Sequence, residues 1–336
     1  MITVIKPGLL TTVQDLGRFG FQKYGIIVSG VMDQFSHRIS NLLVGNEENE
    51  PTLELTLLGP TIEFKKNALI SICGGDLSPT IDGKSVRLWR SVFVKKGSIL
   101  RFGPCKIGCR AYLAVSGGFK IPTIMNSKST YLRAEIGGFN GRALQAGDQL
   151  EFGSPSDLST RIIEHLGKKS ANQQFVEMEW TVAADLIPMH QNKSTIRVMK
   201  GRQFHLFTKE SQNKLFHEPF EVTAQSDRMG YRLKGPKLTL QNAAEMISEA
   251  VNFGTIQVPS DGNPIVLLAD RQTTGGYPKI GQIATVDLPL MAQAKPGDSI
   301  KFTEISRDEA QHLLLERERK IQQLKQGIFL KFRQGD

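Results

Sequence analysis

The sequence predicts a mainly β protein built from two β domains in tandem. Between residues 52 and 153, short apolar runs follow one another about every ten residues, separated by Gly, Pro, Asp or Asn. The chain has 32 glycines and only 7% aromatic residues, a composition typical of proteins with many turns. From Thr195 onward the strand pattern begins again. Such spacing is typical of antiparallel sandwiches and barrels.

Length and composition indicate a globular protein. At 336 residues, with 40% hydrophobic and 22% charged residues, the chain is long enough for two ordinary domains. No apolar run reaches the roughly 18 residues of a membrane span. The first residues lack a basic region followed by an apolar core, so we expect no signal peptide and no membrane attachment. These features predict a cytoplasmic protein.

Charge and cysteine content argue against several classes of site. Cys73, Cys105 and Cys109 are too few for a disulfide framework. The six histidines are scattered along the chain, so we expect no metal site. The net charge is +9, and the excess of basic over acidic residues is most marked near the C-terminal end. No nucleic-acid-binding motif accompanies it, which favours a solvated basic face or a surface for an acidic partner over a nucleic-acid partner.

The elements follow in order along the chain. Residues 2–5 read as a strand, and residues 11–33 as a polar loop punctuated by glycines. A helix is predicted over 33–45, because apolar residues recur there at helical spacing and Gly45 suits its end. Further strands are predicted over 53–58, 61–64, 69–73, 87–94, 99–102, 110–115 and 265–269.

We divide the chain into four parts. They are an N-terminal β domain (1–153), a connecting segment without a core of its own (154–194), a C-terminal β domain (195–304), and a C-terminal helix and tail (305–336). Ser306 and Glu309 have the spacing of a capping box, which predicts the start of the last helix, and Gly327 predicts its end.

Short similarities link the two β domains. Residues 69–76 resemble 265–270, and residues 96–102 resemble 296–302, with two further matches in the same order at offsets of 194 to 200. Four matches in one order suggest a duplicated β domain. We therefore predict that 50–103 and 245–303 superpose as equivalent strands.

Polar residues cluster after one strand of the second domain. The apolar run 265–269 predicts a buried strand, and Asp270 follows it at the head of five polar residues. The glycines at 275 and 276, with Pro278, then predict a tight turn with positive φ. Scaffolds commonly place chemistry where a buried strand ends in such a loop.

These residues suit polarising an amide and moving protons. No Gly-x-Ser-x-Gly elbow and no Walker loop occurs. We expect catalytic roles for Asp270, Lys279, Asp227 and Glu249. Substrate-binding roles are expected for Arg228, Gln257, Arg271, Gln272, Thr273, Thr274, Gly275, Gly276, Tyr277 and Gln282. Structural alternatives stay open for three of them: Arg228 pairs with Asp287, Gln282 bonds a neighbouring strand, and Lys279 is a solvated surface lysine.

Two segments carry a family resemblance. Ser-Asp-Arg-Met-Gly-Tyr-Arg-Leu at 226–233, together with 245–287, resembles the signature of the biotin-dependent carboxyltransferase-like proteins, also described as the allophanate hydrolase subunit 2 family. That family includes the C subunit of bacterial 5-oxoprolinase, known earlier as the antagonist of a sporulation kinase inhibitor. The resemblance extends from Pro7 to Gly297 and implies two tandem cyclophilin-like β-barrel domains with a few helices.

The resemblance implies a function within a complex. In 5-oxoprolinase, the C subunit works with A and B subunits, of which B is the kinase-inhibitor-like protein, to open 5-oxoproline to L-glutamate at the expense of ATP. We expect the same hydrolase here, with no cofactor on this chain and ATP bound by a partner. A urea-carboxylase-type carboxyltransferase is an alternative, although Val198-Met199-Lys200-Gly201 lacks the setting of a biotinyl lysine and no biotin-carboxylase region accompanies it. A non-catalytic regulator that antagonises a histidine-kinase inhibitor is a second alternative.

Overall fold

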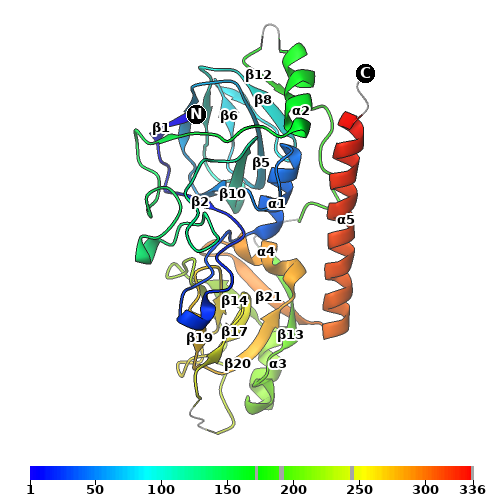
Figure 1. The fold of residues 1–336 in the computed structure, drawn as a ribbon. Coiled ribbons are helices and arrows are strands. Elements are labelled where there is room, and N and C mark those ends of the chain that lie inside the picture. Colours follow the sequence, from blue (N-terminus) through cyan, green and yellow to red (C-terminus); the bar gives the residue numbers. More distant parts are fainter. Residues whose placement is uncertain (171–172, 189–192, 243–245, 334–336) are drawn as a thin grey trace. The chain divides into compact units, whose positions relative to one another are not determined.

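Two units, each with its own core, divide the chain in the computed structural model, which describes residues 1–170, 173–188, 193–242 and 246–333 (Figure 1). The first unit comprises Met1–Gly17, Asp33–Ile187 and Arg319–Asp336, and the second comprises Arg18–Met32 and Pro188–Glu318. Within the described residues, no helix is both long and apolar enough to cross a membrane.

The first unit contains two antiparallel six-stranded sheets. One has the order β11-β1-β4-β9-β6-β7, and the other β12-β8-β5-β10-β3-β2. The strands of the first sheet are β11 (Gln149–Leu150), β1 (Ile2–Lys6), β4 (Thr61–Phe64), β9 (Ile99–Arg101), β6 (Thr80–Ile81) and β7 (Lys84–Ser85). Those of the second are β12 (Phe175–Glu177), β8 (Ser91–Val94), β5 (Ala68–Asp76), β10 (Ile107–Val115), β3 (Thr52–Thr56) and β2 (Leu10–Gln14).

The second sheet is buried on both faces, which explains its continuous apolar runs. Alternate residues of β5, such as Ile70 and Ile72, join the core shared with the first sheet. Leu69 and Cys73, on the opposite face, pack in a second core with helices α1 (Gln34–Leu43) and α2 (Asp157–Lys168). Figure 1 shows these helices and the last turns of α5 (Arg307–Arg333) on the same side of β5 and β10.

Helix α1 begins and ends where the sequence predicts. The Asp33 carboxylate accepts a hydrogen bond from Ser36 N at 2.9 Å, as an N-cap should. Gly45 follows the helix with φ of +75°, and a Cβ there would lie 2.8 Å from Ser159 N. Glycine therefore meets both the backbone conformation and the close approach of α2 at this position.

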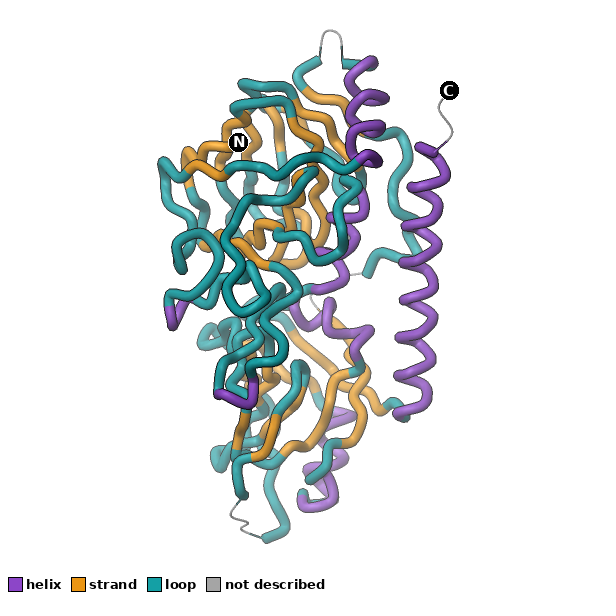
Figure 2. The backbone as a smooth tube through the Cα atoms, in the orientation of Figure 1, coloured by secondary structure: helices purple, strands orange, loops and turns teal. Residues whose placement is uncertain are grey.

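The second unit is a closed seven-stranded barrel. Its order is β13-β20-β17-β18-β15-β14-β21, closed by a parallel pairing of β13 with β21. The strands are β13 (Lys193–Lys200), β20 (Lys279–Ile283), β17 (Thr255–Gln257), β18 (Ile265–Leu267), β15 (Gly230–Lys234), β14 (Pro219–Val222) and β21 (Ser299–Glu304). A two-stranded sheet of β16 (Glu249–Ala250) and β19 (Thr274–Gly275) and helices α3 (Lys209–His217) and α4 (Leu288–Ala292) complete the unit. Long loops join the short strands of both units (Figure 2). The predicted mainly β fold with two β units and a C-terminal helix is confirmed.

The units differ from the predicted boundaries in three places. Residues 18–32 pack with the second unit and residues from Arg319 onward with the first, so both units are discontinuous. Residues of the predicted connecting segment also join a core, since Ile162, Leu166 and Val176 are buried there. Residues 171–172 and 189–192 of that segment lie outside the described residues.

The predicted repeat is wrong over the segments proposed for it. In the first unit β4 pairs with β9, while β4 and β5 lie in different sheets. In the second unit the corresponding β17 pairs with β18, and β21 pairs with β13 and β14. The short sequence similarities therefore come from similar turn and strand residues in two units whose strand orders differ. Residue 245 of the proposed segment lies outside the described residues.

Helix α5 begins at the predicted capping box but does not end where predicted. Glu309 N donates to Ser306 Oγ at 3.2 Å, and Ser306 N donates to the Glu309 carboxylate at 3.0 Å. The helix continues through Gly327 to Arg333. Buried Ile321, Ile328 and Phe332 hold its second half against the first unit, and this packing outweighs the weak helix propensity of one glycine.

Candidate active site

A buried ion pair stands at the end of strand β18. Arg228 Nε donates to Asp270 Oδ2 at 2.9 Å, and Arg228 Nη2 donates to Oδ1 at 3.1 Å. Ser29 Oγ donates to the same Oδ1 at 2.7 Å, and Arg228 also donates to the Gly30 carbonyl. Because both carboxylate oxygens of Asp270 accept hydrogen bonds from charged or hydroxyl donors, the side chain is held in one position.

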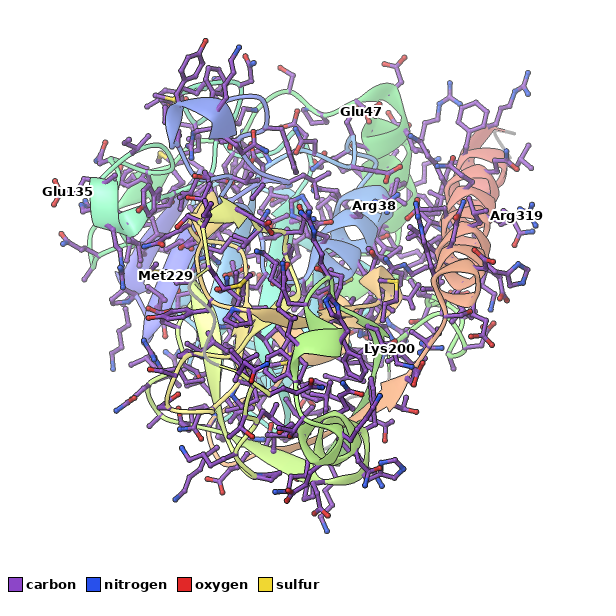
Figure 3. The ribbon with its side chains drawn as sticks, turned by 90° about the horizontal axis from the view of Figure 1, so that it is seen from below. Arg38, Glu47, Glu135, Lys200, Met229 and Arg319 are labelled. Atoms are coloured by element: carbon purple, nitrogen blue, oxygen red, sulfur yellow. The ribbon has the colours of Figure 1, made fainter. Side chains whose placement is uncertain are left out.

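Strand pairing brings Arg228 and Asp270 together. Gly230 lies opposite Leu267 in the β15–β18 ladder. The pairing continues past both strand ends, with Leu268 N donating to Met229 O at 2.9 Å and Asp270 N donating to Arg228 O at 2.8 Å. Met229, in this turn, is labelled in Figure 3. Residues on paired backbones face the same side of the sheet, so the two side chains meet.

A second cluster forms around Lys279. Lys279 is only 9% exposed, and its Nζ lies 3.1 Å from Glu249 Oε2. Arg202 Nη1 lies 3.2 Å from Glu249 Oε1, and Gln203 Nε2 donates to Oε2 at 3.4 Å. The hydrogen bond from Lys279 holds the pKa of Glu249 below its ordinary value. The prediction of a solvated surface lysine is wrong, since the ammonium is buried and paired.

Register places Gln257 beside this lysine. Gln257 lies opposite Lys279 in the β17–β20 ladder and is buried. Its Nε2 donates to the Tyr277 carbonyl at 3.3 Å. A Cβ on Gly275 would lie 2.6 Å from this Nε2. Glycine at 275 therefore lets the buried amide approach the backbone, and a larger residue would have to displace the end of the Gln257 side chain.

The predicted backbone of this loop is wrong. Neither Gly275 nor Gly276 has a positive φ. Gly275 instead lies in β19, paired with Glu249 of β16. Gly275 permits close packing of the Gln257 side chain, and neither glycine forms a left-handed turn.

Arg271 is a desolvated cation without an ion-pair partner among the described residues. Its Nε donates to Val251 O at 3.4 Å and its Nη1 to Leu268 O at 3.3 Å, while the guanidinium lies 5.8 Å from the Phe253 ring centre. Burial lowers the pKa of Arg271 to about 10. A partly buried guanidinium held by neutral carbonyls and an aromatic ring suits an anionic ligand.

Other predicted residues have local structural roles or face solvent. The exposed Asp227 carboxylate accepts from Met229 N at 2.8 Å and caps the turn. Gln282 accepts from Thr255 Oγ1 at 2.9 Å and donates to Phe253 O at 2.8 Å, which ties neighbouring backbone together. Gln272, Thr274 and Tyr277 are exposed, and Thr273 is half-buried.

Asp287 pairs with Arg197 and not with Arg228. It accepts from Arg197 Nε at 2.9 Å and from Arg197 Nη2 at 2.5 Å, so pairing of Arg228 with Asp287 is wrong. The hydrogen bonds to Asp287 raise the pKa of Arg197.

Several residues of the site could not be predicted from the sequence. Ser29 and Gly30 lie in the predicted polar loop 11–33 and have positive φ values of 55° and 91°, and Ser29 donates to Asp270. Arg202 and Gln203 follow β13, and no local pattern marks them. They reach Glu249 only through barrel closure, which a single sequence does not reveal.

The first unit contains a separate buried polar network. Tyr112 Oη donates to Glu54 Oε2 at 2.9 Å and accepts from Asp33 N at 2.8 Å. Burial, with the Glu54 charge, raises the pKa of Tyr112. His37 Nδ1 lies 2.9 Å from Thr52 Oγ1, and burial lowers its pKa to about 4. In the part of the chain that the structure describes, no three His, Cys, Asp or Glu residues gather as a metal site requires.

Comparison with known proteins gives consistent similarities. The family described as carboxyltransferase domain, subdomain A and B, matches residues 24–304. The C subunit of 5-oxoprolinase from Haemophilus influenzae is 38% identical over 328 residues, which cover 98% of this chain and 99% of that protein. Its Escherichia coli counterpart of the same name is 37% identical, covering 96% of this chain and 97% of that protein.

A solved structure resembles the chain over nearly its full length. The Kluyveromyces lactis urea carboxylase matches with a TM-score of 0.86 and 29% identity, covering 97% of this chain. The chain spans only 29% of that urea carboxylase.

Proposed function

Because the chain belongs to the family of carboxyltransferase domains, subdomains A and B, we propose that it is the C subunit of an ATP-dependent 5-oxoprolinase. The observation that carries the proposal is similarity over nearly the whole of two proteins that bear the name of the 5-oxoprolinase C subunit, at 38% and 37% identity. The complex would contain A and B subunits and act in the cytoplasm. ATP would bind a partner subunit, since the sequence has no Walker loop.

The proposed reaction opens a lactam. One water adds across the C–N bond of 5-oxoproline to give glutamate, and a second water cleaves ATP to ADP and phosphate. The substrate has a carboxylate and an amide carbonyl, so a site on this chain needs a cation for the first and polar groups for the second. Both kinds of group are present in the second unit.

We assign the substrate carboxylate to Arg271. Its guanidinium has lost much of its hydration and has no counter-charge among the described residues, so a carboxylate would restore the missing interaction. Lys279 is assigned to the lactam carbonyl, where a buried ammonium stabilises developing negative charge. Glu249, which Lys279 keeps ionised, would orient that ammonium or accept a proton.

Asp270 is better suited to positioning than to proton transfer. Both of its oxygens accept hydrogen bonds from Arg228, and one also accepts from Ser29. The resulting pair fixes the turn in which Arg271 N donates to Leu268 O at 3.2 Å. We therefore assign Asp270 and Arg228 to holding Arg271 in place.

An omission experiment tests the proposal. Phosphate release is measured with 5-oxoproline and ATP for this chain alone, for its A and B partners alone, and for all three together. Oxoproline-dependent release is expected only from the three together. Equal release without this chain, or release by this chain alone, would overturn the proposal.

A urea-carboxylase-type carboxyltransferase is the second candidate. The similarity in fold to the K. lactis urea carboxylase over 97% of this chain favours it. That activity would require carboxybiotin carried by another chain. Urea-dependent decarboxylation of carboxybiotin by the purified chain, without oxoproline-dependent ATP hydrolysis in the complex, would favour this candidate.

A further inference from the structure

An open cavity lies in the first unit, and none of its lining residues belongs to the candidate active site. Its volume is about 500 Å³, and its walls come from residues 180–186 and from the second half of α5. Its large apolar lining residues are Trp180, Leu186, Leu324 and Ile328. A concave, largely apolar site of this size with a few polar groups is typical of small-molecule binding.

Two stripes on α5 explain the cavity. Ile321, Leu324, Ile328 and Phe332 recur at helical spacing and pack against the first unit. A parallel stripe of Lys320, Gln323, Gly327 and Lys331 borders this seam, and all four residues line the cavity. Arg319, labelled in Figure 3, lies outside this stripe and is not among the residues that line the cavity. The cavity thus has a lysine at each end and a glycine between.

Gly327, in the middle of this stripe, adds no side chain to the cavity wall. Glycine destabilises a helix interior, so its presence there calls for a reason. No atom lies within 4 Å of the position that a Cβ would occupy, so close packing in the described structure does not require glycine. The absence of a side chain at this lining position leaves the cavity open between Lys320 and Lys331.

The two ends of the groove differ in charge. Lys320 Nζ lies 3.2 Å from Asp185 Oδ2, which neutralises that end. Lys331 forms no ion pair within the described residues. The Trp180 indole N–H is buried and has no acceptor among the described residues. The groove thus offers one available cation beside an apolar wall.

We propose that this groove binds a small carboxylate with an apolar body, its carboxylate at Lys331 and its body across Gly327 toward Trp180 and Leu186. Lys320 and Lys331 are eleven residues apart, or about 16 Å along the helix axis, which sets an upper limit on the ligand's length. This binding is separate from the proposed hydrolysis and does not depend on it.

Decanoate below its micellar concentration is the probe. Binding to the full chain is measured by calorimetry and by Trp fluorescence, because Trp180 lines the groove while the other tryptophan, Trp89, is buried in a core. Saturable one-site binding is expected, and Trp180→Phe should remove most of the fluorescence change. No binding at millimolar decanoate, or equal binding of decyltrimethylammonium, would overturn the proposal.

Substitutions locate the site. Gly327→Leu should abolish binding by filling the groove, and Lys331→Gln should weaken it about tenfold. Gly167→Leu is the matched control, since Gly167 is also a helical glycine with nothing within 4 Å of its Cβ position. If Gly327→Leu fails to fold, Gly327→Ala, which favours the helix, and Lys331→Gln decide the outcome. Unchanged affinity in these variants would place the binding elsewhere and contradict the assignment.

Discussion

Lys279 Nζ lies 3.1 Å from Glu249 Oε2, with the lysine buried and the carboxylate side chain 34% exposed. The pair joins the barrel strand β20 to the small β16–β19 sheet. A buried cation held by a partly accessible anion can interact with a ligand without leaving its place.

Lys279→Met should impair turnover more than stability. The charged contact to the substrate is worth about 1.5–3 kcal/mol, so kcat of the assembled enzyme should fall roughly ten- to a hundredfold. Because Glu249 retains contacts from Arg202 and Gln203, the folded chain keeps the anion partnered. Oxoproline-dependent ATP hydrolysis and a thermal melt measure the two effects, and near-normal turnover would leave the lysine without a catalytic role.

Asp270→Asn should destabilise the second unit. The change leaves the Arg228 guanidinium buried without a counter-charge, which costs about 3–5 kcal/mol. Urea denaturation measures the loss. Glu151→Gln is the control, because it breaks the exposed pair with Lys120, worth about 0–1 kcal/mol. Similar losses in both variants would show that the buried pair contributes no more to stability than an exposed one.

Stability should fall as the pH falls from 6.5 to about 4. Burial lowers the pKa of His37 from 6.5 to about 4, so within this window the unfolded chain binds a proton that the folded chain does not. The contribution of neutral His37 to the free energy of unfolding is fully present above pH 6.5 and amounts to about 3 kcal/mol. His37→Gln should flatten this slope in urea titrations at several pH values, whereas exposed His217→Gln should not. An equally steep slope without His37 would contradict the assignment.

Arg271→Met should raise KM for 5-oxoproline, because the variant loses the cation assigned to the substrate carboxylate. An increase of about tenfold or more is expected, with little change in the KM for ATP. Arg307→Met, which removes an exposed guanidinium with no assigned role, is the control. An unchanged KM for 5-oxoproline would remove Arg271 from the binding site.

Local features of the fold follow from the sequence, and long-range ones do not. The caps at Asp33 and Ser306 are short-range hydrogen bonds, so the start of each helix is predictable from a few residues. Gly327 predicts a helix end on propensity alone, but the packing of Ile328 and Phe332 decides the outcome. Tertiary contacts override weak local preferences in such cases.

The candidate site shows the same limit. Asp270, Arg228 and Lys279 are recognisable as polar residues near strand ends and by resemblance. Their partners are not, because Ser29 lies 241 positions from Asp270 in the chain and Gln203 meets Lys279 only after the barrel closes. The spatial arrangement depends on strand register, which local pattern does not specify.

Formation of glutamate tests the central claim most directly. Labelled 5-oxoproline and ATP are incubated with the A and B partners, with and without this chain, and glutamate is separated and counted against ADP. The account predicts glutamate and ADP in equal amounts only when this chain is present, and much less of both with the Lys279→Met variant. Glutamate formed equally well without this chain would contradict the account.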